Sequence, residues 1–174
     1  HYGTLVIMHT TIVTPYRSPV VDLSSKNGYM RIHNTLVMHP SGIESNQPLV
    51  GASRNHASVS NSGGSHLWLS AGFTPPSSGK FTHVTQGEPG GTPAFIDTDA
   101  ADYTPATEFE GVVDAGTAGD ELLLPALGDR PIRTFTPPLG SRARAYAGEP
   151  DIGACERSTA ALIPFLYRRG DRIP

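Results

Sequence analysis

Short runs of alternating apolar and polar residues, separated by turns, dominate the chain from Gly3 to Ser70. The alternation covers residues 3–13 and returns over residues 29–38, and each run ends at a proline-containing turn. Such alternation predicts β-strands, because successive side chains of a strand point to opposite faces. Shorter strands are predicted at residues 20–23 and 48–52. The 3.6-residue period of an amphipathic helix is absent.

The two long strand-rich segments also match each other. Met8-His9-Thr10-Thr11-Ile12-Val13 recurs as Ile32-His33-Asn34-Thr35-Leu36-Val37, which aligns Met8 with Ile32. A weaker third copy is predicted where Val59-Ser60-Asn61 takes the place of Ile32-His33-Asn34. A repeat of this length predicts a solenoid built one coil at a time, here an all-β parallel β-helix.

Stacked coils place equivalent residues in ladders along the axis, with strands about 4.8 Å apart. The apolar residues predicted to point inward are Val6, Met8 and Ile12 in one coil and Met30, Ile32 and Leu36 in the next. A structural ladder of Thr10, Asn34 and Asn61 is predicted at a bend, because Asn tolerates unusual backbone angles. His9 and His33 are expected to stack on each other.

The position of the first copy suggests how the chain is organised. A coil buries its apolar face against neighbours on both sides, so a repeat that begins at Leu5 is expected to follow another segment. The expected partner is a preceding β-helix segment or another copy of the chain. The predicted divisions are terminal coils at 1–72, a Pro/Gly-rich loop at 73–93, a C-terminal cap at 94–157 and a tail at 158–174.

Composition narrows the functional classes without choosing one. Charged residues make up 17% of the 174 residues and the net charge is -3, which gives no basic stripe for nucleic acid. The single cysteine, Cys155, cannot form an internal disulfide and is interpreted as a small, partly buried hydrophobic residue; the alternative is a bridge to another chain or a reactive thiol. No signal peptide or membrane-spanning run is present. The first residue is His1 and not Met, so the missing signal peptide says nothing about export.

Four segments in the second half resemble a known family. They are Gly91-Thr92-Pro93-Ala94-Phe95-Ile96-Asp97, Asp102-Tyr103, Gly111-Val112-Val113-Asp114-Ala115-Gly116-Thr117 and Pro150-Asp151-Ile152-Gly153-Ala154-Cys155-Glu156. In this order they resemble the C-terminal signature of bacterial, secreted right-handed parallel β-helix proteins of the pectin-lyase-like superfamily, including those with a choice-of-anchor domain. The chain departs from the pattern at Glu110-Gly111, and Cys155 stands where an aromatic residue is usual.

The resemblance implies a right-handed parallel β-helix whose last coils are closed by an irregular cap, and a secreted or cell-surface location. In the cap, Asp114 and Asp151 are expected to accept backbone N–H bonds. The resemblance says little about activity, because the superfamily contains lyases, hydrolases, adhesins and structural fibres.

Basic residues near the second copy are the candidates for catalysis. Polysaccharide lyases of this superfamily use Arg or Lys to remove a proton beside a uronic carboxylate, and Lys26, Arg31 and His33 could supply such a set. His9 and His33, if they face outward, could instead line a ligand groove, and Trp68 could stack on a sugar. The alternative for the histidines is a solvated ladder, and for Trp68 a residue that covers the coils.

Acidic residues in the predicted cap are candidates for a calcium site, and no other cofactor is expected. Asp97, Asp99 and Asp102 offer oxygen ligands, although capping of turns explains the same residues. The predicted function is that of a capping portion of an extracellular β-helix protein, with a structural, adhesive or carbohydrate-binding surface. The alternative is the tail of a polysaccharide lyase or glycoside hydrolase whose catalytic coils lie upstream.

Overall fold

A computed structural model of the chain describes residues 3–15, 18–39, 46–52, 59–89, 95–97, 102–106, 109, 111–117, 133–136, 140–143 and 149–153. Over these ranges the secondary structure consists of β-strands and one short 3-10 helix. The elements are β1 (Gly3–Met8), β2 (Thr11–Val13), β3 (Val21–Leu23), β4 (Gly28–Met38), β5 (Gln47–Pro48), β6 (Val50–Ala52), η1 (Val59–Asn61), β7 (Ser62–Leu69), β8 (Phe73–Thr74), β9 (Lys80–Gln86), β10 (Phe95–Asp97), β11 (Asp102–Pro105), β12 (Arg133–Thr136) and β13 (Gly140–Ala143).

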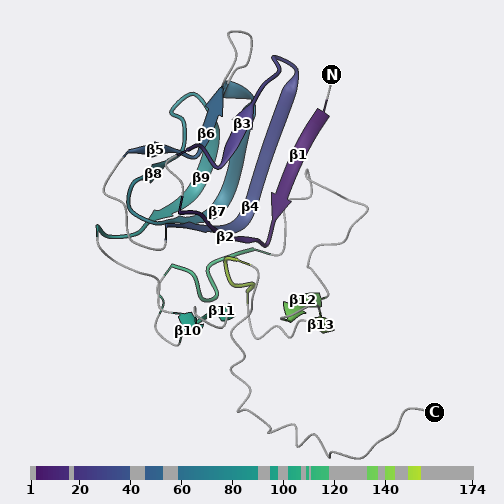
Figure 1. Cartoon of the computed structure of the whole chain (residues 1–174), viewed down its shortest axis with the longest axis vertical. Helices are drawn as coiled ribbons and strands as arrows, with labels where there is room; N and C mark the ends of the chain where they lie inside the picture. Colours follow the sequence, from purple (N-terminus) through teal and green to yellow (C-terminus); the bar gives the residue numbers. More distant parts are fainter. Residues whose placement is uncertain are drawn as a thin grey trace, which may run out of the picture.

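One parallel sheet organises the first half of the chain. Its strand order is β1-β4-β7-β9, with β2 also paired to β4, and every pairing in it is parallel (Figure 1). Two small sheets, β3 with β6 and β5 with β8, are parallel as well. The later pairs, β10–β11 and β12–β13, are antiparallel. The described part of the chain is therefore all-β, with parallel sheets.

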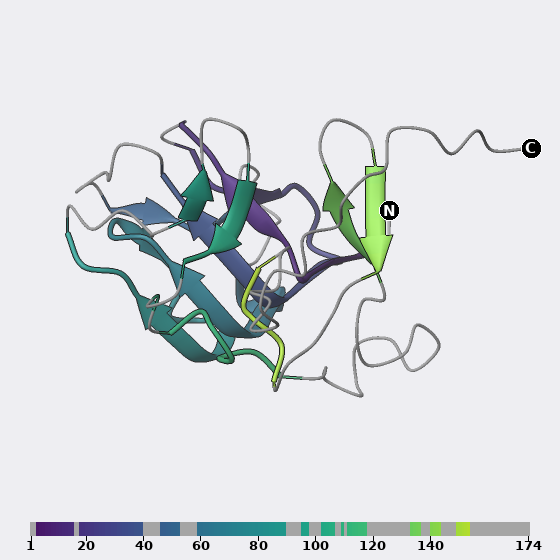
Figure 2. The same cartoon turned by 90° about the horizontal axis from the view of Figure 1, so that it is seen from below.

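The chain returns to the large sheet after passing through a short strand of another sheet. β3 lies between β2 and β4, β5 and β6 lie between β4 and β7, and β8 lies between β7 and β9. Parallel neighbours require such crossovers, because a tight turn can join only antiparallel strands. Figure 2 shows the strands of the large sheet side by side from below, with the β12–β13 pair apart from them.

The pairing register corrects the predicted repeat. Gly3 lies opposite Gly28 and Met8 opposite His33, so the first two copies are shifted by one position from the predicted match of Met8 with Ile32. The third copy is Gly64-Ser65-His66, because Ile32 pairs with Gly64 and His33 with Ser65. Val59-Ser60-Asn61 instead forms η1. The spacings vary because the strands stack by backbone pairing, while the connections differ in length.

A fourth strand of the sheet falls in the segment predicted to be a loop. β8 and β9 both lie within residues 73–93, and β9 pairs with β7 over Gly63–Leu69. Among the described residues of this segment, Pro75-Pro76 lies in the connection before β9 and Gly87 in the one after it. The repeat therefore continues through β9.

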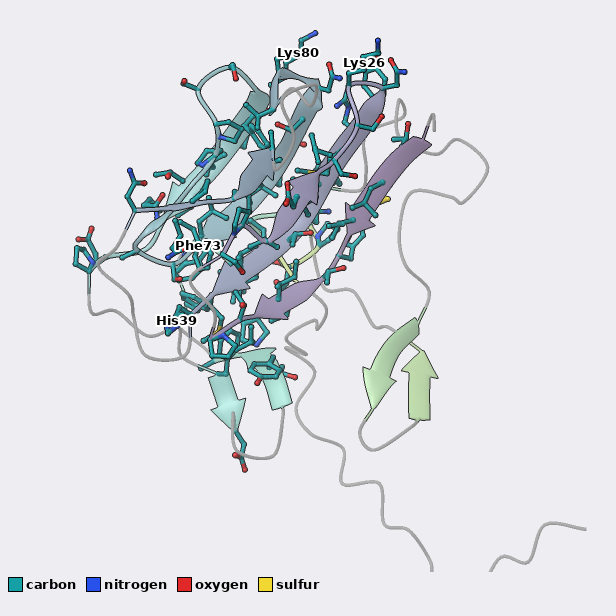
Figure 3. All side chains as sticks on the ribbon, turned by 45° about the horizontal axis from the view of Figure 1, so that its top comes forward. Lys26, His39, Phe73 and Lys80 are labelled. Atoms are coloured by element: carbon teal, nitrogen blue, oxygen red, sulfur yellow. The ribbon has the colours of Figure 1, made fainter. Side chains whose placement is uncertain are left out.

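Two apolar clusters lie on opposite sides of the large sheet. The first is internal and contains Phe73, which Figure 3 places beneath the strands. Its buried members are Leu23, Met30, Ile32, Val37, Leu49, Val50, Leu67, Leu69 and Phe73. The second, the outer cluster, is formed by Leu36, Met38, Trp68, Val112 and Ile152.

The inward prediction is right for Met30, Ile32 and Ile12 and wrong for three other residues. Ile12 packs against the internal cluster. Val6 pairs with Arg31 and Met8 with His33, so the one-position change of register puts Ile7 against the internal cluster in their place. Leu36 belongs to the outer cluster.

Segments from the second half cover the outer cluster. Val112 and Ile152 are buried there, and the Ile152 N–H donates to the Val112 carbonyl at 2.8 Å. The Gly153 N–H donates to the Asn34 carbonyl of β4 at 2.9 Å. The Asp151 carboxylate accepts the N–H of Asp114 at 2.7 Å, as predicted for Asp151. No described segment forms a helix of the length and hydrophobicity that crossing a bilayer requires.

Candidate functional site

A bend in the large sheet occurs at the same register position in four strands. His9, Asn34, His66 and His83 occupy this bend position, with φ angles of 44°, 43°, 53° and 51°. Positive φ is uncommon outside glycine, and Asn and His are among the residues that tolerate it best. The bend position therefore explains why these four positions hold only His and Asn.

Four imidazole rings lie close together along this bend. We call His9, His33, His66 and His83 the histidine row. Ring centroids are 6.3 Å apart between His9 and His33 and 5.7 Å apart between His33 and His66, both in edge-to-face geometry. His66 and His83 stack at 4.6 Å with an interplanar angle of 8°. The row runs from His9 and His33, which are 9% and 1% exposed, to exposed His83.

Polar contacts of His33 and of the neighbouring Asn34 hold the buried part of the row. His33 Nδ1 lies 2.7 Å from the Ser65 hydroxyl. The Asn34 side chain donates to the Thr117 carbonyl at 2.5 Å and accepts the Thr117 N–H at 3.1 Å. Asn34 Nδ2 also lies 3.5 Å from the His9 ring nitrogens. Asn34 therefore joins the bend position to the segment that covers the outer cluster.

Burial lowers the pKa of His66 below its ordinary value of 6.5, and the neighbouring His83 lowers it further. Both effects act in the same direction, because desolvation and a second cation each disfavour the imidazolium. His66 Nδ1 is buried and has no hydrogen-bond partner in the described ranges. His66 is therefore held as a neutral ring at pH 7, with a nitrogen lone pair or N–H that the described residues leave unsatisfied.

The predicted ladder of Thr10, Asn34 and Asn61 is wrong in two of its three members. Asn34 is at the bend, but its neighbours in register are His9 and His66. The Thr10 hydroxyl donates to the Met8 carbonyl, and Asn61 Nδ2 donates to the Lys26 carbonyl. The error follows from the one-position offset and from the misplaced third copy.

The predicted catalytic candidates do not gather into an exposed set. Lys26 is exposed on the turn before β4, at the end of the sheet where Figure 3 also places Lys80. Arg31 Nη1 donates to the carbonyls of Met30 and Asn61, at 2.9 and 3.1 Å. His33 is buried and cannot meet a substrate directly. The imidazole of His33 is buried and the guanidinium of Arg31 is engaged by backbone carbonyls. Both observations argue against a lyase-type base in this part of β4.

The remaining candidates fall elsewhere. Trp68 is only 4% exposed and its ring centroid lies 5.0 Å from that of Phe109, so it cannot offer a sugar an open face; it is a buried member of the outer cluster. Asp97 and Asp102 are opposite each other in β10–β11, while Asp99 lies outside the described residues, as does Cys155. Within the described residues, no group of three or more His, Cys, Asp or Glu side chains is arranged to hold a metal ion.

The sequence analysis missed His66 and His83 as partners of His9 and His33. The alternation of the sequence contained a signal for both histidines. His66 precedes Leu67 and His83 precedes Val84, and these two apolar residues pack inward. Unequal connections concealed it, because β5, β6 and η1 all lie between β4 and β7 while only β8 lies between β7 and β9. A search at one fixed period passes over both positions.

Comparison with protein-family models, with curated proteins and with solved structures finds no match for this chain.

Proposed function

We propose that the chain is a module of a right-handed parallel β-helix, secreted or displayed at the cell surface, which serves as a rigid scaffold with a surface for acidic carbohydrate. The observation that carries the proposal is the parallel register of β1, β4, β7 and β9, with short strands of other sheets between them. A solenoid produces this pattern, because each coil crosses the same sheets in the same order.

Close backbone packing supports the role of a rigid scaffold. A Cβ added to Gly64 would lie 2.1 Å from the Ile32 carbonyl oxygen, and one added to Gly63 would lie 2.7 Å from the Lys80 carbonyl oxygen. Neighbouring strands therefore approach at glycines where a side chain would separate them. The residues at the bend position share a left-handed backbone conformation. Each strand therefore changes direction at the same point.

Cationic residues near one end of the sheet support the binding role. Arg31, Gly63 and Lys80 are consecutive in register across β4, β7 and β9. Lys80 is exposed, and exposed Lys26 lies at the same end (Figure 3). Exposed ammonium groups at one end of the sheet suit a polymer whose carboxylates repeat along its length. Catalysis receives no such support, because His33 is buried and Arg31 is occupied.

The binding role is tested with soluble uronic-acid polymers and a neutral polymer, using isothermal titration calorimetry at low and moderate salt. We expect binding to the acidic polymers alone, weakened by salt and by the double variant K26Q/K80Q. The matched control, K26R/K80R, keeps both charges and should bind as the wild type does. No binding by the wild type, or equal binding by K26Q/K80Q, would overturn the proposal.

The fold is tested separately by an experimental structure at a resolution that shows side chains. We expect the path from β4 through β5 and β6 to β7 to wind in a right-handed sense. A left-handed path, or antiparallel pairing of β4 with β7, would rule out the proposed β-helix.

A further inference from the structure

We propose that His66 and His83 form a two-imidazole site for a divalent late first-row transition ion such as Zn²⁺. The two residues are directly opposite each other on β7 and β9, as the pairs on either side of them show. Their rings are stacked nearly parallel, with centroids 4.6 Å apart, so the two imidazoles are in contact. Imidazole nitrogen is a preferred ligand of these ions.

The backbone arranges the pair before any ion arrives. His66 and His83 both have left-handed backbone conformations, with φ of 53° and 51°, so their side chains leave the two strands in the same direction. Hydrogen bonding of β7 to β9 fixes the distance between the two strands. Convergence of two ring nitrogens on one ion requires the rings to turn out of this parallel stack about their side-chain torsions.

The state of His66 favours metal binding. Its Nδ1 atom is buried and has no hydrogen-bond partner among the described residues, so a bound ion would satisfy it. His83 is exposed and gives the ion a path from solvent.

The neighbouring His33 positions the pair and is not a ligand. Its Nδ1 is engaged with the Ser65 hydroxyl at 2.7 Å, and its ring meets His66 edge-to-face. Two protein ligands leave the remaining positions on the ion to water or to a bound molecule, as in open metal sites. The site is therefore one for reversible binding.

The bend position itself supplies substitutions that keep the fold. Asn already occupies it at residue 34 with the same backbone conformation. H66N and H83N each remove one imidazole and retain a residue suited to positive φ. H9N makes the same change at the far end of the row and is the matched control.

The experiment titrates ZnCl2 into the full chain at pH 7.5, with calorimetry for affinity and imidazole NMR signals for location. We expect a saturable site that perturbs the His66 and His83 rings and is absent at pH 5, because protons compete for the nitrogens. Outer-shell substitutions at metal sites weaken binding about 10- to 100-fold, so loss of a direct ligand in H66N or H83N should cost at least as much.

H9N is expected to bind Zn²⁺ with the affinity of the wild type, and circular dichroism should show all three variants folded. Binding that survives in both H66N and H83N would overturn the proposal, because the ion would then be held elsewhere. Absence of binding by the wild type at millimolar Zn²⁺ would overturn it as well. Equal loss in H9N would indicate a general effect on the row and would also count against the assigned pair.

Discussion

At the scale of single residues, the backbone conformation at the bend explains why His and Asn recur there. His9, Asn34, His66 and His83 all have φ between 43° and 53°. In this region the Cβ of most residues lies too close to a backbone carbonyl oxygen, which costs about 1–2 kcal/mol per residue. His and Asn reduce that cost, and Asn34 adds two hydrogen bonds to Thr117. Three of the four imidazoles of the histidine row, those of His9, His66 and His83, therefore lie where the backbone conformation favours His or Asn.

The substitution N34A should lower the free energy of unfolding by about 2–4 kcal/mol, because it adds left-handed strain and leaves the backbone groups of Thr117 unsatisfied. N34G removes the strain but also loses the hydrogen bonds, so it should be less destabilised than N34A. Urea unfolding followed by circular dichroism measures both. Equal stability of N34A and the wild type would contradict the role given to Asn34.

His66 should make stability depend on pH. Its pKa is lowered in the folded chain, so the unfolded chain binds more protons between the lowered value and 6.5. The contribution of neutral His66 is fully present above pH 6.5 and is lost as pH falls through the folded pKa. We expect wild type to lose stability relative to H66N over that range, measured by urea unfolding at several pH values. A difference that does not change with pH would contradict the assignment.

At the scale of secondary-structure elements, the spacing between β4 and β7 depends on a glycine. Gly64 pairs with Ile32, and a Cβ there would approach the Ile32 carbonyl oxygen to 2.1 Å. The two strands would have to separate, which would weaken their ladder of hydrogen bonds. A strand residue without a side chain is thus required by the neighbouring strand and not by its own conformation.

G64A should therefore destabilise the chain by about 1–3 kcal/mol or more, as overpacking in a tight interior does. G3A is the matched control, because a Cβ at Gly3 would meet nothing within 4 Å. Thermal unfolding of both variants gives the comparison. A G64A variant as stable as G3A would show that β4 and β7 are not packed as described.

At the scale of the whole molecule, the outer cluster joins the large sheet to segments that follow much later in the chain. Ile152 and Val112 pack on Leu36, Met38 and Trp68, and backbone hydrogen bonds accompany the contact. Apolar burial of this kind makes unfolding of the two parts cooperative.

I152A should cost about 2–5 kcal/mol, the usual range for truncating a buried Ile. The half-buried neighbour Val113 provides the control, since V113A should cost much less. Hydrogen exchange of the β4 amides should rise in I152A and not in V113A. Unchanged exchange in I152A would mean that the large sheet is stable without its cover.

Several features of the fold could be read from the sequence. Alternation over residues 3–13 and 29–38 identified β1, β2 and β4, and the match between those segments predicted their parallel stacking. The sequence did not predict β9, because the Pro and Gly residues on both sides of Lys80–Gln86 are typical of a loop. Local composition did not reveal that β7 provides a partner for this strand.

The sequence by itself determined the all-β class and the repeating strands, because alternation and turn residues act locally. Only the tertiary structure decided which residues are neighbours in the row. Shifting a strand by a single position exchanges its two faces, and connections of unequal length hid the true register. Hydrogen bonding between strands fixed that register, and with it the His66–His83 pair on which the proposed metal site depends.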